Sequence, residues 1–300
     1  MPKGIVLITG INGFLGNSIG KELISSGFEV IGLDQAPACS LTGVNSYFSA
    51  SVLDKEKVNA AVSRAQFVVH LASLTTHDEI TFKPYLALEV AIVGTKNVLD
   101  AFVASPASKM FLFSSSGKVY GRSGKPPLDE SMPANPTNFL GKSKLLVEQL
   151  ISFYSTEPKS FVAFRIFNVF GPGQRDQFLI PTVAKQLRHG NLLKLGDLRA
   201  KRDYVYVDDI ARAFRSAIES SLSNGFHIYN ICSGVASSAS DILDLFSSIT
   251  GKKIQAVSQP SLLRPDELDI EFGSFLKIEK DLGWKPVVSL REGLKNVQAP

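Results

Sequence analysis

The sequence predicts an α/β fold, with a doubly wound parallel sheet and a smaller mixed α/β lobe at the C-terminal side. Three observations support this prediction: short apolar runs alternate with helical patterns, a glycine-rich turn follows the first run, and the regularity ends beyond residue 170. Alternation of strand and helix builds a parallel sheet that helices cover on both faces.

The first half of the chain carries the alternation. Residues 4–9 are typical of a buried strand, apolar side chains then recur at helical spacing over 14–27, and a second strand is expected over 28–33. Further strands are expected at 67–71, 110–113 and 161–165, with helices at 54–64, 87–104 and 141–154.

The second half is less regular and suggests a domain boundary. A helix is expected near 180–189, a β-type run at 204–207 and a further helix from Asp208. We therefore assign residues 1–170, together with 204–232, to a dinucleotide-binding domain. Residues 171–203 and 233–300 are assigned to a substrate lobe over the carboxyl ends of the strands, where open α/β sheets bind ligands.

Composition excludes several classes of protein. With 44% hydrophobic and 20% charged residues in 300, the chain is neither disordered nor collagen-like. The net charge of +4 is spread along the chain and gives no support for a nucleic-acid partner. Cys39 and Cys232 lie far apart, so we expect neither a disulfide framework nor a metal site. Without an apolar run long enough for a signal or a membrane span, we expect a cytoplasmic protein.

The glycine turn predicts a dinucleotide site. Gly10, Gly13 and Gly16 lie at a strand-to-helix junction, where glycine lets backbone N–H groups approach a pyrophosphate. Asp34 ends the second strand, where its carboxylate can accept the ribose hydroxyls and would repel a 2′-phosphate. A Rossmann-type domain that binds NAD is therefore favoured over one that binds NADP. The alternative is that the glycines serve only the turn.

Further motifs follow the glycine triplet in a fixed order: His70-Leu-Ala-Ser73, Gly94-Thr-Lys-Asn97, Ser114-Ser-Ser-Gly-Lys-Val-Tyr-Gly121, Gly141-Lys-Ser-Lys144, Arg165-Ile-Phe-Asn168, Gly171-Pro-Gly-Gln174, Arg202-Asp-Tyr-Val-Tyr-Val-Asp-Asp209 and Leu282-Gly-Trp-Lys-Pro286. With these motifs the chain resembles the extended short-chain dehydrogenase/reductases, in the sugar-nucleotide epimerase, dehydratase and reductase branch. Its carboxyl-terminal third, with Tyr229-Asn-Ile-Cys-Ser-Gly234 and Arg264-Pro-Asp-Glu267, looks most like enzymes of GDP-linked 4-keto-6-deoxy sugars.

The resemblance implies NAD as cofactor and a set of contacts to it. Two positions depart from the family pattern: Ser51 stands where an Asp usually contacts the adenine, and Ala91 stands where Asn is usual. The implied cofactor-binding residues are Gly10, Asn12, Gly13, Phe14, Leu15, Gly16, Asp34, Ser51, Val52, Leu71, Ala72, Ser73 and Lys144.

The resemblance also implies a catalytic Tyr-x-x-x-Lys pair, of which only the lysine is present. Lys144 matches it, whereas Leu140 holds the place of the tyrosine and has no proton to exchange. Ser116 matches the hydroxyl that bonds the reacting sugar oxygen. Gly117 and Lys118 follow where sugar dehydratases carry an Asp-Glu pair, which argues against that reaction.

Lys118 and His77 are candidate substitutes for the missing acid/base, and the alternative, which the pattern favours for both, is a solvated surface residue. Ser116, Asn168, Gln174, Arg202 and Arg264 match substrate-binding positions, the arginines being suited to a diphosphate. In the alternative reading, Arg202 pairs with Asp208 or Asp209.

Two functions follow as hypotheses. The first is an NAD-dependent 4-epimerase or 4-keto reductase acting on a GDP-, UDP- or dTDP-linked sugar, with atypical proton handling. The second is a catalytically impaired relative that binds NAD, a sugar nucleotide or both as a subunit or sensor. The resemblance further implies a homodimer formed by two helices of each copy.

Overall fold

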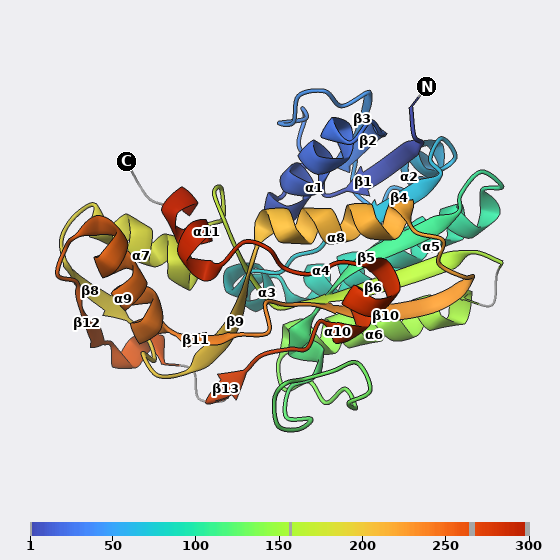
Figure 1. Ribbon diagram of the computed structural model, residues 1–300. Coiled ribbons are helices and arrows are strands. Elements are labelled where there is room, and N and C mark those ends of the chain that lie inside the picture. The colour runs from blue at the N-terminus through green and yellow to red at the C-terminus, as the bar shows by residue number, and fades with distance from the viewer. Residues whose placement is uncertain (1, 156–157, 264–267, 298–300) are drawn as a thin grey trace.

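The computed structural model describes residues 2–155, 158–263 and 268–297. One part of the molecule is a large sheet flanked by helices, and a smaller lobe lies beside it (Figure 1). The predicted doubly wound α/β fold is confirmed. Among the described residues, none of the helices has both the length and the apolarity needed to cross a membrane.

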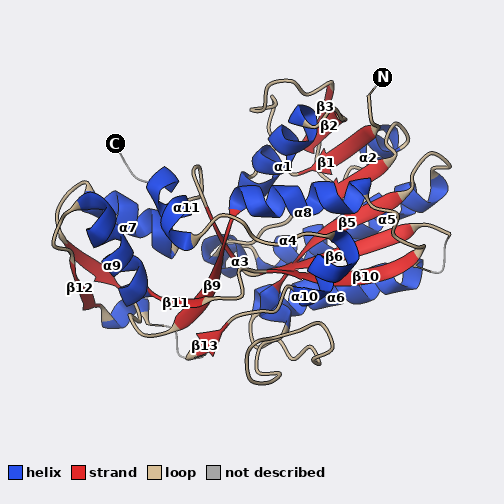
Figure 2. Cartoon of the chain, in the orientation of Figure 1, coloured by secondary structure: helices blue, strands red, loops and turns tan. Residues whose placement is uncertain are grey.

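The large sheet has seven parallel strands in the order β10-β6-β5-β4-β1-β2-β3 (Figure 2). The strand order reverses between β1 and β4, so the carboxyl ends of these two strands flank the position where doubly wound sheets bind nucleotides. The strands are β1 (Ile5–Thr9), β2 (Glu29–Asp34), β3 (Ser46–Ser49), β4 (Phe67–His70), β5 (Met110–Ser116), β6 (Ser160–Ile166) and β10 (Gly225–Ile231).

Helices cover both faces because successive side chains of a strand point to opposite sides. Val6 and Ile8 pack in the core with α1 (Phe14–Ser25) and α8 (Val207–Glu219). Leu7 packs in the opposite core with α2 (Lys55–Val62), α5 (Thr95–Ala104) and α6 (Phe139–Tyr154). Burial on both faces accounts for the unbroken apolar run of β1.

Short helical segments connect these elements. The helices α3 (His77–Phe82) and α4 (Pro84–Glu89) precede a π-helical turn, η1 (Val90–Gly94), which continues into α5. A 3₁₀ turn, η2 (Gly117–Val119), follows β5.

The smaller lobe is built on two small sheets. One contains β7 (Asn168–Phe170), β9 (Lys201–Tyr206), β11 (Ala236–Ser238) and β13 (Ile270–Glu271), and the other contains β8 (Leu192–Leu195) and β12 (Gln255–Ser258). Its own apolar core lies among the helices α7 (Leu179–Leu187), α9 (Ala239–Thr250) and α11 (Leu290–Val297). The remaining segments are η3 (Pro260–Leu262) and α10 (Leu276–Leu282), which packs on β10.

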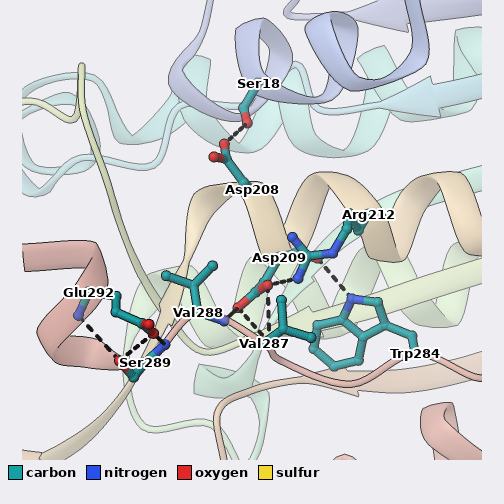
Figure 3. A network of polar contacts seen from close by, with 9 residues as sticks. All are labelled: Ser18, Asp208, Asp209, Arg212, Trp284, Val287, Val288, Ser289 and Glu292. Atoms are coloured by element: carbon teal, nitrogen blue, oxygen red, sulfur yellow. Dashed lines mark hydrogen bonds and ion pairs between the residues drawn. The ribbon is translucent and has the colours of Figure 1, made fainter. Parts of the chain in front are cut away.

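Asp209, in the first turn of α8, fastens the C-terminal segment to the large sheet's helices (Figure 3). Its carboxylate accepts hydrogen bonds from the N–H groups of Val287 and Val288 and pairs with Arg212. Trp284 donates from Nε1 to the carbonyl oxygen of Asp209 at 2.8 Å. The chain is therefore held at this helix as it passes into the smaller lobe.

Candidate functional site

The glycine turn after β1 forms a cradle at the start of α1. Gly10 has φ +73°, and a Cβ at Gly16 would lie 2.3 Å from the carbonyl oxygen of Gly10. Both positions therefore require glycine. Gly13 is the N-cap, and no described side chain caps α1 there. The N–H groups of the first turn of α1 are thus oriented as in an anion site.

Asp34 lies beside this turn, as the sequence predicts. Its Oδ2 accepts a hydrogen bond from the N–H of Asn12, and its Oδ1 accepts one from Ala36, both at 3.1 Å. The Asn12 side chain also bonds the following loop, donating to the carbonyl of Ala38 and accepting from the N–H of Ser40. The carboxylate is consequently fixed at the end of β2 next to the glycine cradle.

The segment that contains Ser51 and Val52 also lies at this edge, after β3. Ser51 Oγ accepts from the N–H of Leu53 at 3.2 Å, and Asn97 on α5 donates to the carbonyl of Val52 at 3.1 Å. A glycine cradle, an uncapped helix end and a fixed carboxylate together suit the pyrophosphate and ribose of a dinucleotide. The described residues therefore fit the predicted cofactor.

His70 is buried in a chain of hydrogen bonds. Thr95 donates its hydroxyl proton to the carbonyl of Ala91, so its oxygen accepts from His70 Nε2 at 2.9 Å. His70 Nδ1 then accepts from the hydroxyl of Thr9 at 2.8 Å. Burial, reinforced by the nearby charge of Lys144, lowers the pKa of His70 to about 3. His70 is therefore neutral and structural.

The same Thr9 fixes the segment that follows β4. Its Oγ1 accepts hydrogen bonds from the N–H groups of Leu71 and Ala72 at 3.2 and 3.3 Å. A Cβ at Gly10 would lie 3.0 Å from the nitrogen of Ala72. Two of the residues predicted to contact the cofactor are thus held against the glycine turn.

Lys144 is buried on α6. Its Nζ donates to the carbonyl of Ser114 at 2.7 Å and lies 4.6 Å from the centroid of the Phe113 ring. Burial lowers the pKa of Lys144 to about 8, although the carboxylate of Glu148 opposes this shift. Leu140 lies one turn earlier on the same helix, where its half-buried aliphatic side chain cannot exchange a proton.

Ser116 and Lys118 lie next to the start of α6. Ser116 Oγ accepts from the N–H of Lys118 at 3.2 Å and so caps η2. The backbone of Lys118 packs closely against α6, because a Cβ at Gly141 would lie 2.3 Å from the carbonyl oxygen of Lys118. The structure therefore brings Ser116, Lys118, Leu140 and Lys144 to one corner at the carboxyl end of β5.

A buried polar network lies behind this corner. Glu148 accepts from Ser115 and forms two hydrogen bonds with Arg165, whose guanidinium lies 4.8 Å from the ring centroid of Tyr120. The Tyr120 hydroxyl donates to Asn230 at 2.7 Å, and burial raises the pKa of Tyr120 to about 12. Because its proton is committed to Asn230, Tyr120 is not a replacement for the absent tyrosine.

The predicted substrate residues lie in or beside the smaller lobe. Asn168 donates to the carbonyl of Asp203 at 3.0 Å, and Gln174 donates to that of Val169 at 2.8 Å. Arg202 is buried on β9 and lies with its Nε 3.8 Å from Glu271 Oε2. Arg264 and the side chain of His77 lie outside the described residues.

Asp208 and Asp209, the alternative partners of Arg202, lie at the start of α8 and have other contacts. Ser18 donates to Asp208 at 3.2 Å, and Arg212 pairs with Asp209 (Figure 3).

Two carboxylates near Lys118 and Arg202, those of Glu271 and Asp203, are not among the site residues that the sequence predicts. Glu271 Oε2 accepts from Lys118 Nζ at 2.6 Å. Asp203 is buried and accepts from Ser233 and from the N–H groups of Gly234 and Gly273; burial raises its pKa to about 6. Asp203 stands inside a motif that the sequence already marks, whereas nothing local distinguishes Glu271.

Comparisons with known proteins identify relatives along most of the sequence. The GDP-6-deoxy-D-mannose reductase of Pseudomonas aeruginosa is 30% identical over 239 residues, which cover 77% of this chain and 78% of that protein. A putative UDP-glucose 4-epimerase of Methanocaldococcus jannaschii is 29% identical and covers 98% of this chain, with 97% of its own length matched.

Solved structures of two epimerases have the same fold as this chain. The UDP-glucose 4-epimerase of Thermotoga maritima with UDP-glucose has a TM-score of 0.89 at 28% identity, and that of Thermus thermophilus with NAD has 0.86 at 29%. Each comparison covers 98% of this chain and 97% of the other.

The family comparison bears directly on the cofactor. The family model that matches residues 6–232 is described as NAD dependent, in agreement with the cofactor expected from the glycine turn and Asp34. The match covers well over half of the sequence, and the chain therefore belongs to the NAD dependent epimerase/dehydratase family.

Proposed function

We propose that this protein is an NAD-dependent enzyme that acts on a nucleotide-diphospho-sugar, as a 4-epimerase or a 4-keto reductase. One observation carries the proposal: the glycine cradle with Asp34 and the corner formed by Ser116 and Lys144 lie at the same edge of one parallel sheet. Its relatives include a GDP-sugar reductase and a UDP-glucose 4-epimerase with bound UDP-glucose, which supports this class of substrate.

Bound NAD would supply the hydride chemistry, while side chains of this chain hold the reactants. We assign the ribose of the adenosine to Asp34 and the nicotinamide ribose to Lys144. With a pKa of about 8, Lys144 is still mostly protonated at neutral pH and can donate a hydrogen bond to that ribose. Ser116 would bond the reacting sugar oxygen. Arg202 would face the diphosphate, with Asn168 and Gln174 beside it. Arg264 stays a prediction.

Proton handling distinguishes this chain from the usual pattern. Leu140 cannot donate a proton, so either Ser116 passes it through water or a second group supplies it. Of the two predicted substitutes, Lys118 is the one whose side chain the structure describes. It follows Ser116 on η2, and its side chain is 29% exposed. In the reductive direction its ammonium would give a proton to the oxygen formed at the sugar carbonyl and be left as the neutral amine.

The second candidate is a binding protein with little turnover. Leu140 favours it, because a hydroxyl that normally moves the proton is absent. The polar groups that remain in place, Ser116 and Lys144 among them, favour the enzyme.

The two candidates are separated by assaying the purified protein with NAD or NADH and a panel of UDP-, dTDP- and GDP-linked hexoses and 4-keto sugars. Product is followed by chromatography and by absorbance at 340 nm, and binding by calorimetry. The enzyme predicts product from at least one sugar. Binding without product would support the second candidate, and absence of binding to NAD and to every sugar nucleotide would contradict both.

We further propose that two copies associate through α4, η1 and α6. η1 packs against both α4 and α6, and these segments carry large apolar side chains on the surface: Leu86 is 39% exposed, Val93 45% and Leu146 48%. Neighbouring exposed apolar residues on helices are typical of an interface. A second copy of the chain, which would bury the same face on both sides, is the occupant that we propose.

A further inference from the structure

Glu271 links the two parts of the molecule at the candidate site. Its carboxylate is buried, with 5% of the side chain exposed, and one oxygen, Oε2, lies 2.6 Å from Lys118 Nζ and 3.8 Å from Arg202 Nε. Lys118 belongs to η2 beside the large sheet, whereas Arg202 belongs to β9 of the smaller lobe. A single carboxylate therefore contacts one cation from each side.

The backbone fixes the position of this carboxylate. β13 pairs in parallel with β9, and Glu271 is the direct partner of Arg202 in that register. The next residue, Phe272, accepts at its carbonyl from the N–H of Leu128 at 2.9 Å, and the N–H of Gly273 donates to Asp203 at 3.3 Å. Glu271 thus has little freedom to leave the two cations.

The buried charge of Glu271 is paired. A buried carboxylate is costly unless it is paired, and here Lys118 and Arg202 are its cationic neighbours. Without the carboxylate, the two cations would repel each other, and the flexible lysine would turn toward solvent.

We propose that Glu271 is a positioning residue, which holds the Lys118 ammonium on the Ser116 side and Arg202 on the diphosphate side of the same bound sugar nucleotide. This role rests on the proposed function, since it needs a ligand that spans both cations. The contacts run in one row: Ser116 Oγ with the Lys118 N–H, Lys118 Nζ with Glu271, and Glu271 with Arg202.

The test uses Glu271→Gln, which keeps the shape and removes the charge. Its matched control is Glu22→Gln, which removes a 2.7 Å ion pair with Arg215 between α1 and α8. Calorimetry measures the affinity for UDP-glucose and GDP-mannose, and for UDP and GDP as probes without the sugar. The rate at which Lys118 is acetylated, followed by mass spectrometry, measures how accessible its amine is, with and without each nucleotide.

For Glu271→Gln we expect at least about a tenfold loss of affinity for the sugar nucleotide and faster acetylation of Lys118, with neither change in the control. In the unaltered protein, the sugar nucleotide should protect Lys118, whereas the nucleoside diphosphate should protect it less. Lys118→Met should cause a similar loss, and the double variant should add little to either single change.

Unchanged affinity and unchanged acetylation in Glu271→Gln would overturn the positioning role while leaving the proposed function intact. If the unaltered protein binds no sugar nucleotide, the proposed function fails and the role falls with it. Should Glu271→Gln not fold, as judged by circular dichroism, Lys118→Met decides alone, because normal sugar-nucleotide affinity in that variant would overturn the role.

Discussion

Glu148 and Arg165 form a buried ion pair joined by two hydrogen bonds, of 3.1 Å to Nε and 2.8 Å to Nη2. Glu148 lies one turn beyond Lys144 on α6, and Arg165 lies on β6. Glu148 also accepts from Ser115 on β5, so one carboxylate joins a helix to two strands. This pair therefore sets the position of α6, and with it that of Lys144, against the sheet.

Glu148→Gln should lower the free energy of unfolding by about 3–5 kcal/mol, because it leaves the Arg165 charge buried without its counter-ion. Urea denaturation at pH 7 measures the loss. Replacing both residues, as Glu148→Met with Arg165→Met, should recover part of it. Glu22→Gln, which breaks a partly exposed pair, should cost about 1 kcal/mol or less, and an equal cost for Glu148→Gln would contradict the prediction.

Leu140→Tyr should restore a hydroxyl four residues before Lys144 and raise turnover. General acid/base assistance contributes about a hundred- to ten-thousandfold, which bounds the gain. The measurement is kcat with the sugar nucleotide that the binding panel identifies. Leu140→Phe, which has the ring without the hydroxyl, is the control. An equal rate for both variants would mean that the proton is handled elsewhere.

Asp34→Ala should weaken NAD binding by roughly 1–3 kcal/mol, the scale of a lost buried polar partner. It should also reduce the preference for NAD over NADP, since the carboxylate no longer repels the 2′-phosphate. Calorimetry with both cofactors provides the measurement. Glu56→Ala, on the exposed surface of α2, should leave both affinities unchanged. Equal affinity of the unaltered protein for NAD and NADP would contradict the assignment.

His70 should make the protein sensitive to acid. Its pKa is about 3 in the folded state and about 6.5 in an unfolded chain, so the proton binds preferentially to the unfolded state. The stability due to neutral His70 is present above about pH 6.5 and is lost as the pH falls toward 3.

Between pH 7 and pH 5, His70 alone should remove about 2 kcal/mol of unfolding free energy. Asp203 acts in the opposite direction, because its pKa of about 6 is raised and protonation favours the folded state. The measurement is therefore a difference: His70→Gln should be less stable than the unaltered protein at pH 7, and the gap should narrow at pH 5. A constant gap would contradict the prediction.

Leu146→Asp should convert the proposed dimer into a monomer, because it places a charge on the exposed apolar surface that α6 contributes to the proposed interface. Sedimentation velocity measures the molecular mass. Leu276→Asp on α10 is the matched control, since that leucine is 69% exposed and α10 packs in the core opposite that of α6. A monomeric unaltered protein would refute the association directly.

Local pattern predicted the centre of the large sheet well. β1 and residues 110–113 of β5 are apolar on both faces, so the sequence predicts both strands, and the glycine turn and Asp34 occupy the predicted positions. The edge strands β3 and β10 are less evident. Residues 225–228 of β10 are only half-buried, which removes the continuous apolar run that marks a central strand.

Contacts between residues that lie far apart in the sequence could not be predicted from local pattern. The place of Lys118 near Ser116 marks it in the sequence as a candidate acid, but its bond to Glu271 joins residues 153 positions apart. No periodicity or spacing encodes such a pairing, because it arises only when β13 aligns with β9. The proposed division into two domains and the roles of the individual site residues stay predictions.

The position of β10 has a consequence for the nascent protein. β10 pairs with β6 at the end of the large sheet, yet it follows β6 in the chain only after β7, α7, β8, β9 and α8. While the ribosome synthesises that intervening stretch, β6 presents an open hydrogen-bonding edge. The unfinished chain is therefore open to aggregation during translation at an edge that the finished protein covers.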